Sequence, residues 1–409
     1  MRLHLFFNCC AANAGGGLTY VRNLAPQVST REDVKATIVV NRALVSGLPI
    51  YANVTWLPIE TSNSTARRFW KEQVLLPELI RRVGADVLIS AGNFALRRSP
   101  VPQILLSGNS LYVSKEFRRD LRNRREFGLL LGNSIKSRLA KRSLRWADCV
   151  IAPTKAFARS LEDWSRVKIK CVHHGFNRQQ FITQSEELLS DAKQKLDAAA
   201  NSLRLLFVSH YNYYRNFETL LRAIPLIKKT MPDRGVKLFV TCRFTKKDNP
   251  SSYNPESAAR LIRELNIGDS VVELGTVPHA ELPDVYRSCD IYVTPAYAET
   301  FAFPLVEGMA CGLPVVASDI PVHREICGAA ATYFPTFSAA DLAERTVTVA
   351  NSADMKQQLI SAGKIRSTDF SWSKHIEELV LTARQLVSGR TASAKVNEVS
   401  DDYEIAAAS

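Results

Sequence analysis

The chain has 409 residues, a formal net charge of +13 at pH 7 and an apolar content of 46%. This length exceeds what one hydrophobic core usually supports, so we expect two domains. No apolar run approaches the roughly 18–20 residues of a membrane-spanning helix, which argues against a helical membrane protein. The run at residues 1–7 is interrupted by His4 and is too short for a signal peptide, so it is predicted to be a buried strand.

The positive charge is concentrated in the first part of the chain. Residues 1–175 carry 28 Lys and Arg against 12 Asp and Glu, whereas the remainder carries 25 against 28. Residues 115–145 alone hold 11 basic and three acidic side chains, with Phe117 and Phe127 among them. Such a basic face is typical of contact with nucleic acid, an anionic membrane or an acidic substrate, although a solvated helical face has the same composition.

The eight cysteines predict neither disulfides nor a zinc site. Most lie inside apolar, strand-like segments, no two form a Cys-x-x-Cys pair, and no histidine stands at ligand spacing from a cysteine cluster. Reduced, buried thiols of a cytosolic protein are the simplest interpretation.

Strands alternate with helices through residues 1–175, the pattern of a doubly wound parallel sheet. The first strand, residues 3–7, leads into the loop Gly15-Gly16-Gly17, whose backbone N–H groups are accessible to a phosphate. A helix is predicted over 18–28. Further strands are predicted at 36–40, 54–57, 86–90, 103–106, 149–152 and 169–172.

The alternation starts again after a linker near residue 175, so a second Rossmann-like domain is predicted over 176–372. A final helix over 373–389 is expected to cross back to the first domain, and the polar, Ala-rich tail 390–409 is expected to be disordered. Strands are predicted at 204–209, 236–242, 271–274, 290–294 and 315–317, and helices at 218–229, 256–265 and 280–287.

The stretch 292–319 carries the most specific pattern in the chain. An apolar strand ends in a loop that holds Glu299, and Pro304 suits the first position of a following helix. Glu307 is predicted in the first turn, and Gly312 ends the helix before the next strand. Two carboxylates and the free N–H groups of a helix N-terminus are thus placed at the carboxyl edge of a sheet, where open α/β sheets bind nucleotides and phosphates.

Glu299, seven residues, Glu307 and the later Gly-Leu-Pro-Val-Val-Ala-Ser resemble family 4 of the retaining nucleotide-sugar glycosyltransferases. The resemblance implies that Glu299 contacts hydroxyls of the donor sugar and that Glu307 holds the ribose of the nucleotide. It also implies that the backbone of Ala302–Val306 meets the sugar and the diphosphate, which makes Ala302, Phe303, Pro304 and Leu305 donor-binding candidates. The chain departs from the family at Ala302, where glycine is usual.

A second string, 205–217, resembles the family's other donor-binding strand. Arg215 stands where the family has a lysine that neutralises the leaving diphosphate, so Arg215 and Glu299 become the predicted catalytic residues. Ser209-His210 occupies the position of the family's Gly-Arg, so the first of the family's two cations is not matched here. By the same resemblance Gly16 and Gly17 face the diphosphate, and Glu325 closes the nucleotide site or pairs with an interdomain arginine.

The resemblance implies two Rossmann-like domains facing across a cleft, the GT-B fold, and transfer that retains the anomeric configuration. A nucleotide-diphosphate sugar would be the donor and a saccharide, lipid-linked, the acceptor, in cell-surface polysaccharide or lipopolysaccharide synthesis. Neither a metal nor another cofactor is expected, because no Asp-x-Asp precedes the helix. Residues 115–145 are expected to dock on anionic lipid at the cytoplasmic face of the membrane.

Two other functions are compatible with parts of the sequence. A basic nucleic-acid-binding protein with a Rossmann-like core would account for the charge of residues 1–175, although no nucleic-acid motif is visible. A sugar-nucleotide epimerase of the same fold would use the same donor and release a free epimer without any acceptor.

Overall fold

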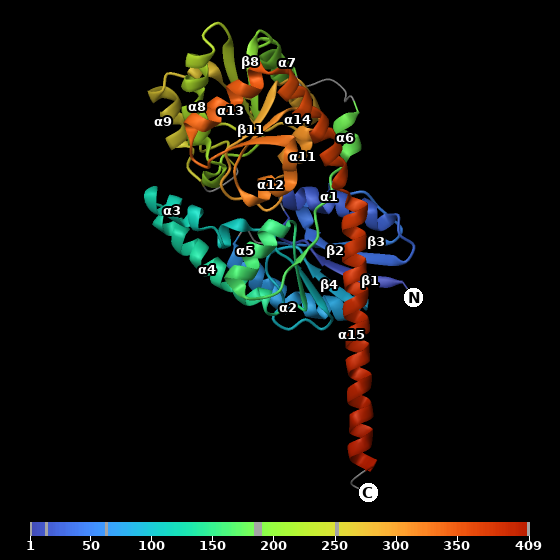
Figure 1. The fold of residues 1–409 in the computed structure, drawn as a ribbon. Helices are drawn as coiled ribbons and strands as arrows, with labels where there is room; N and C mark the ends of the chain where they lie inside the picture. Colours follow the sequence, from blue (N-terminus) through green and yellow to red (C-terminus); the bar gives the residue numbers. More distant parts are fainter. Residues whose placement is uncertain (1, 13–14, 62–63, 184–189, 250–252, 407–409) are drawn as a thin grey trace. The chain divides into compact units, whose positions relative to one another are not determined.

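The computed structural model describes residues 2–12, 15–61, 64–183, 190–249 and 253–406, with the backbone alone for 390–406 (Figure 1). The chain divides into two compact units. Unit 1 comprises residues 1–113, 131–175 and 372–409, and unit 2 comprises 114–130 and 176–371. In the described ranges no helix has both the length and the apolar character needed to cross a bilayer.

Unit 1 contains a seven-stranded parallel sheet in the order β3-β2-β1-β4-β5-β6-β7. β1 is buried along its whole length, as expected for the central strand of a sheet that is covered on both faces. The strands are β1 (Leu3–Asn8), β2 (Val34–Asn41), β3 (Val54–Ile59), β4 (Val87–Ser90), β5 (Gln103–Leu106), β6 (Cys149–Ala152) and β7 (Lys170–Cys171).

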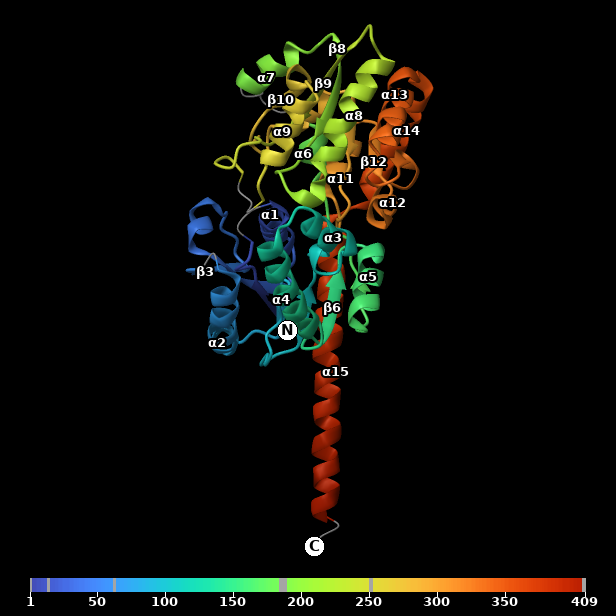
Figure 2. The ribbon, with the colours of Figure 1, turned by 90° about the vertical axis from the view of Figure 1, so that its left-hand side faces the viewer.

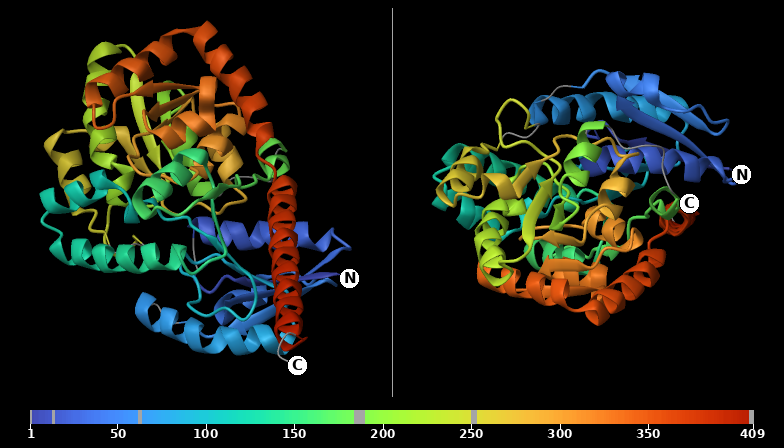
Figure 3. Two further views of the ribbon diagram at one scale, coloured as in Figure 1. Left: turned by 60° about the horizontal axis from the view of Figure 1, so that its bottom comes forward. Right: turned by 90° about the horizontal axis from the view of Figure 1, so that it is seen from above.

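Helices cover both faces of this sheet (Figure 3). On one face, Leu76 and Ile80 pack against Phe6, Val39 and Leu88 of the sheet. On the other face, the first helix of the unit packs against its last helix. The helices of unit 1 are α1 (Gly15–Ser29), α2 (Thr65–Val83), α4 (Phe127–Leu144, whose first four residues belong to unit 2), α5 (Lys155–Ser165) and α15 (Trp372–Ala406).

Unit 2 contains a six-stranded parallel sheet in the order β10-β9-β8-β11-β12-β13. Its connections run to one side from β8 and to the other side from β11, so both sheets are doubly wound as the sequence predicts. The strands are β8 (Ser202–Phe207), β9 (Gly235–Val240), β10 (Val271–Glu273), β11 (Ile291–Thr294), β12 (Val315–Ser318) and β13 (Ala331–Phe334).

The helices of unit 2 follow from this topology (Figure 2). Right-handed crossovers that diverge from β8 and β11 place their helices on opposite faces of the sheet. Accordingly α8 packs with α9 and α13, whereas α10 and α11 pack with each other. The helices are α3 (Lys115–Asn123), α6 (Arg178–Ile182), α7 (Ser190–Asp197), α8 (Phe217–Thr230), α9 (Glu256–Glu264), α10 (Leu282–Arg287), α11 (Phe303–Ala310), α12 (Pro321–Cys327), α13 (Ala339–Asn351) and α14 (Ala353–Arg366).

Three local features differ from the sequence prediction. The glycines at 15–17 form the first turn of α1 instead of a loop, because a helix N-terminus accepts glycine at little cost. β13 escaped prediction because Ala331–Phe334 is half-buried at its two middle residues and lacks a continuous apolar run. α15 continues to Ala406, through most of the tail that was expected to be disordered, since alanine-rich sequence favours helix.

The largest difference concerns segment Ser114–Leu130, which the sequence places in the first domain. The segment leaves unit 1 after β5 and packs in unit 2. Phe117 is buried there, in edge contact with the rings of Tyr214 and Tyr253. Helix α3 therefore uses its apolar side for folding, and Phe117 is not available for insertion into a membrane.

Candidate functional site

The carboxyl edge of the unit 2 sheet holds most of the predicted site residues. β8 and β11 are parallel neighbours, but the connection from β8 leads to β9 and the connection from β11 leads to β12 on the other side. Loops 208–216 and 295–302 follow these two strands at the same edge. Such a switch point is where open α/β sheets bind their ligands.

Hydrogen bonds join the two loops. Asn216 Nδ2 donates to Pro295 O at 3.1 Å, and Tyr297 N donates to Tyr214 O at 3.0 Å. Asn216 is buried and left-handed, with φ 55°, a conformation that asparagine tolerates better than most residues. Its Oδ1 accepts from Thr219 Oγ1 at 2.8 Å, so one side chain connects both loops to the start of α8.

Arg215 and Glu299, the two predicted catalytic residues, form an ion pair between these loops. Their side chains are only 19% and 9% exposed. Arg215 Nε is buried and has no hydrogen-bond partner among the described residues. Burial, together with the Arg215 charge, lowers the pKa of His210, so this neighbouring imidazole is neutral at pH 7. The permanent cation at this edge is therefore Arg215.

The N-terminus of α11 lies at the same edge, beyond Glu299. Ala302 precedes the helix with φ 65°, and Pro304 stands in its first turn. An L-residue pays roughly 1–2 kcal/mol for this backbone conformation, which explains why glycine is the expected residue at position 302. Phe303 begins a helix whose dipole is positive at this end, which suits an anion. Pro304 has no N–H, and Leu305 N donates to Ala302 O at 3.0 Å.

Glu307 lies in the second turn of α11, not in the first turn as predicted, because the helix begins at Phe303. The carboxyl is buried, and its Oε2 accepts from Tyr286 Oη at 2.8 Å. Burial raises the pKa of Glu307 to about 7, against a smaller opposing effect of the Tyr286 hydrogen bond. His279 Nε2 lies 4.0 Å from Glu307 Oε1. A buried carboxyl that titrates near neutral pH is typical of a functional position.

Two further predicted residues occupy other loops of unit 2. Ser209 N donates to Thr241 Oγ1 at 2.9 Å, and Ser209 Oγ donates to His210 O at 2.8 Å, so the serine lies at the start of the loop that carries Arg215. Glu325 is half-buried on α12, and its backbone carbonyl accepts from Arg366 Nη2 at 2.6 Å.

Gly16 and Gly17 belong to unit 1, at the exposed first turn of α1 after β1. A Cβ on Gly17 would come within 3.2 Å of Ala12 Cα, so this close approach favours glycine. The structure thus brings Arg215, Glu299 and the start of α11 together in unit 2, and it places the two glycines at the carboxyl edge of the other sheet.

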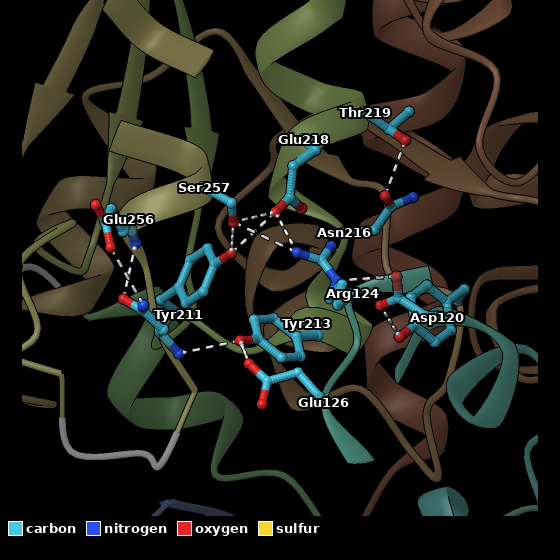
Figure 4. Close-up of polar contacts among 12 residues, drawn as sticks. Asp120, Arg124, Glu126, Tyr211, Tyr213, Asn216, Glu218, Thr219, Glu256 and Ser257 are labelled. Atoms are coloured by element: carbon cyan, nitrogen blue, oxygen red, sulfur yellow. Dashed lines mark hydrogen bonds and ion pairs between the residues drawn. The ribbon is translucent and has the colours of Figure 1, made fainter. Parts of the chain in front are cut away.

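Sequence reasoning missed a cluster of polar residues beside the Arg215 loop (Figure 4). Its centre is Glu218 Oε1, which accepts from Arg124 Nη1 at 2.9 Å, from Tyr211 Oη at 2.9 Å and from Ser257 Oγ at 3.0 Å. The Arg124 guanidinium also lies 4.2 Å from the centroid of the Tyr213 ring. Burial opposes ionisation of Glu218, but Arg124 outweighs it and holds the pKa of Glu218 below its ordinary value.

The same cluster reaches the second loop of the site. Arg124 Nε donates to Asp120 Oδ1 at 2.9 Å, and Asp120 Oδ2 accepts from Tyr297 Oη at 2.8 Å. Glu126 accepts from Tyr213 Oη at 2.6 Å. Segment Ser114–Leu130 therefore contacts both loops that carry the Arg215–Glu299 pair.

Little in the sequence predicts these contacts. Asp120 and Arg124 are spaced for an ordinary helical ion pair, but Arg124 and Glu218 are 94 residues apart. The usable signal was the apolar spacing of Phe117 and Leu121, which marks a buried face on α3.

Residues 190–366 match the family model "Glycosyl transferases group 1". A D-inositol 3-phosphate glycosyltransferase from Thermobispora bispora is 29% identical over 237 residues, which are 56% of this chain and 53% of that protein. The chain thus spans about half the length of the curated relatives it matches.

Solved structures resemble the whole chain. Sucrose-phosphate synthase from Thermosynechococcus elongatus gives a TM-score of 0.77 at 18% identity, covering 95% of this chain and all of that one. Anabaena HepE in complex with UDP and glucose gives 0.67 at 17% identity, covering 94% and 100%. At this identity the likeness shows the fold alone, and the fold is the GT-B fold that the sequence predicts.

Proposed function

We propose, on the premise that residues 190–366 are a glycosyl transferases group 1 domain, that this chain is a retaining glycosyltransferase. It would move a sugar from a nucleotide diphosphate to a hydroxyl of a saccharide acceptor. The observation that carries the proposal is the Arg215–Glu299 pair at the switch point, next to the N-terminus of α11. A cation, a carboxylate and the positive end of a helix dipole match the diphosphate and the sugar hydroxyls of one donor.

In the proposed reaction the anomeric C–O bond breaks and negative charge builds on the diphosphate. Arg215 and the positive end of the α11 dipole stabilise that charge, because both are preorganised and need no reorientation. The unpartnered Nε of Arg215 gives a phosphate oxygen a donor that is otherwise buried unsatisfied. The departing phosphate takes the proton of the acceptor hydroxyl, which attacks from the same face and so retains the configuration.

The other predicted residues position the donor in this proposal. Glu299 accepts hydrogen bonds from sugar hydroxyls, and Glu307 accepts them from the ribose. Gly16 and Gly17 offer amides to the diphosphate from unit 1. Ser209 flanks the phosphates, and Glu325 closes the nucleotide site. A uridine nucleotide is the first candidate, because Anabaena HepE, which has the same fold, was crystallised with UDP and glucose.

We also propose that the chain acts at an anionic membrane on a lipid-linked saccharide. Part of the basic segment is unavailable for this, since Arg124 is paired inside unit 2. Helix α4 offers an alternative surface: Phe127, Leu131 and Ile135 are 63%, 63% and 57% exposed, and their four-residue spacing aligns them on one side. Exposed basic side chains such as Lys136 each contribute about 1 kcal/mol near anionic lipid.

The first experiment incubates the purified chain with UDP-, GDP- and ADP-sugars and follows thermal shift, slow hydrolysis and transfer to saccharide acceptors. We expect one donor to bind and turn over, with turnover unchanged by excess EDTA because Arg215 and the helix dipole supply the positive charge. Loss of turnover on chelation, restored by Mg²⁺ or Mn²⁺, would contradict the metal-free mechanism. A free epimer without acceptor would indicate an epimerase, and salt-sensitive RNA or DNA binding without donor turnover would indicate a nucleic-acid-binding protein.

Co-sedimentation with vesicles tests the membrane contact. The protein should pellet with anionic and not with neutral vesicles, less so at high salt, and Leu131→Ser with Ile135→Ser should weaken this. The matched control is Leu226→Ser, which changes an exposed leucine on α8. Binding that ignores lipid charge would contradict the proposal.

A further inference from the structure

A groove of about 990 Å³ lies on unit 1, and none of the predicted donor-site residues lines it. Its walls are α2, the chain between β4 and β5, and the C-terminal end of α4 with the two residues that follow (helices labelled in Figure 2). The groove extends along α2 from Phe69 to Arg81, about 18 Å at the rise of an α-helix. Arg81 stands just before β4 begins, so the groove reaches the amino edge of the sheet, opposite the edge that carries Gly16 and Gly17.

The groove is strongly basic. Five arginines line it, and all five are exposed. None of its lining residues is acidic. Within the described part of the chain, none of them forms an ion pair. Five uncompensated positive charges along one cavity make it complementary to an anion with several charges. The five are Arg81, Arg97, Arg98, Arg142 and Arg145.

Apolar and aromatic side chains lie between these charges. Trp70 is 70% exposed and Val74 is 69% exposed, on the side of α2 that faces the groove. The rings of Phe69 and Trp146 are 6.5 Å apart, and Phe69 packs edge-on against Phe94 at 5.9 Å. Exposed apolar side chains that gather in one cavity rimmed by polar groups are typical of a ligand-binding groove.

Two side-chain amides fix the walls of the groove. Gln73 Nε2 donates to Ala95 O at 3.1 Å, and its Oε1 accepts from Arg97 N at 2.8 Å, which fastens the β4–β5 connection to α2. Gln103, fully buried on β5, accepts from Leu96 N at 2.7 Å and donates to Trp146 O at 3.4 Å. The cavity is therefore built into the fold before any ligand arrives, and preorganisation of this kind lowers the cost of binding.

We propose that this groove binds an acidic saccharide chain, with its carboxylates or phosphates on the arginines and its sugar rings on Trp70 and Trp146. Planar guanidinium groups match such anions in bidentate fashion, and aromatic faces cover the apolar faces of sugar rings. The identity of the ligand rests on the proposed function, since a glycosyltransferase acts on saccharides. Because the groove reaches the far edge of the sheet, it would hold a part of the acceptor remote from the sugar being transferred.

A bilayer and a single-stranded nucleic acid are the competing occupants. A bilayer presents a flat surface, and the concave groove fits it less well than the exposed stripe of α4 does. Single-stranded RNA also combines phosphates with stacking bases. The acceptor chemistry of the proposed function favours the saccharide over the RNA, and direct competition between probes decides.

Calorimetric titration of the intact chain is the test, with a hexameric oligogalacturonate as the probe and the neutral maltohexaose as its control. We expect the acidic hexamer to bind, more weakly at high salt, and the neutral one not to bind. Replacing Arg97 and Arg142 together by Ala should weaken binding about tenfold or more, since each removes charge-assisted hydrogen bonds. Trp70→Ala should weaken it several-fold. Arg67→Ala, on the same helix but outside the groove, should leave the affinity within about twofold.

Each outcome settles the proposal separately from the donor site. A thermal shift on adding the nucleotide sugar, retained by all groove variants, shows that the variants fold and that unit 2 functions independently. No binding of the acidic hexamer, or equal binding by the groove variants, overturns the proposal. Tighter binding of single-stranded RNA or of anionic vesicles, lost in the same variants, also overturns it by assigning the groove to another ligand. If the acidic hexamer binds but no donor is turned over, the proposed saccharide binding in the groove holds and the proposed function fails.

Discussion

Unit 2 contains two arginine–carboxylate pairs that look alike in composition and burial but differ in their surroundings. The side chains of Arg124 and Glu218 are 20% and 18% exposed, close to the 19% and 9% of Arg215 and Glu299. Arg124 and Glu218 have Asp120, Tyr211 and Ser257 as additional partners.

Arg215 pairs with one carboxylate, and its Nε has no partner in the described part of the chain. In the other pair the buried atom without a partner in the described part of the chain is an acceptor, Glu218 Oε2, while the Arg124 guanidinium donates to Asp120, Glu218 and Ser257. A pair with a buried donor to spare can bind a ligand, because the ligand removes an existing cost. Exposure and residue type do not separate the two pairs, but the atom left without a partner does: it is a donor at Arg215, suited to an anionic ligand, and an acceptor at Glu218.

The largest expected effect concerns the Arg215–Glu299 pair at the switch point. Arg215→Ala and Glu299→Ala should each lower transfer by about 10²-fold or more, the effect of losing one preorganised contact to the transition state. The free energy of unfolding should change much less than the activity, which steady-state kinetics and urea denaturation measure on the same preparations. Near-normal turnover in both variants would remove these residues from the active site.

The other pair should behave in the opposite way. Arg124→Ala leaves Glu218 and Asp120 without their cation, so the free energy of unfolding should fall by about 2–3 kcal/mol, somewhat below the loss for a fully buried pair. Urea denaturation measures this, with Arg122→Ala, an exposed arginine on the same helix, as a control that should stay within about 0.5 kcal/mol. A variant of unchanged stability would contradict the structural role of the cluster.

The contrast between the pairs also marks the limit of what the sequence predicts. Arg215, Glu299 and the strands before them were identifiable because they lie in continuous strings whose residue types follow the strand–loop–helix geometry. The position of segment Ser114–Leu130 was not, because no local pattern encodes its contact with Glu218, 94 residues away. Its positive charge suggested an exposed basic face, whereas Arg124 is paired with Glu218, which only the folded chain brings near.

The prediction was accurate where the local sequence determines the structure and less accurate where packing does. Strand cores such as 103–106 and 149–152 were predicted to the residue, since buried apolar runs define them. Glu307 was placed one position too early on α11, because Pro304 was predicted to be the first helical residue and is the second. Its burial and its contact with Tyr286 depend on packing between α10 and α11, which the sequence pattern does not give.

Glu307 provides a pH-dependent test of the donor site. Its pKa in the ligand-free protein is raised to about 7 by burial, so the group is largely protonated at pH 6 and largely ionised at pH 8. Ribose hydroxyls donate to the ionised carboxylate, so donor affinity should rise several-fold from pH 6 to pH 8. The affinity of Glu307→Gln should be weaker and independent of pH over this range, with kcat little changed.

Titration calorimetry with a nucleotide sugar is suitable because its diphosphate does not titrate in this interval. The sign for folding is opposite to that for binding. A raised carboxyl pKa stabilises the folded state below the unfolded pKa, and this contribution is lost as the pH rises through about 7. Affinity that falls with rising pH, or a Glu307→Gln variant that loses only kcat, would contradict the ribose-binding role.

The smallest effect is expected at Asn216 and Ala302, which have the same left-handed backbone conformation in the two loops. Asn216 and Ala302 both have positive φ, 55° and 65°, but only Asn216 has side-chain hydrogen bonds that stabilise this conformation. Ala302→Gly removes the strain of the Cβ, partly offset by the greater freedom of glycine in the unfolded chain, so stability should rise by about 0.5–1 kcal/mol. Asn216→Gly should lower it instead, because Pro295 and Thr219 lose their partner. Urea denaturation of the two variants side by side tests this, and a destabilised Ala302→Gly would mean that the Cβ at this loop packs favourably rather than straining it.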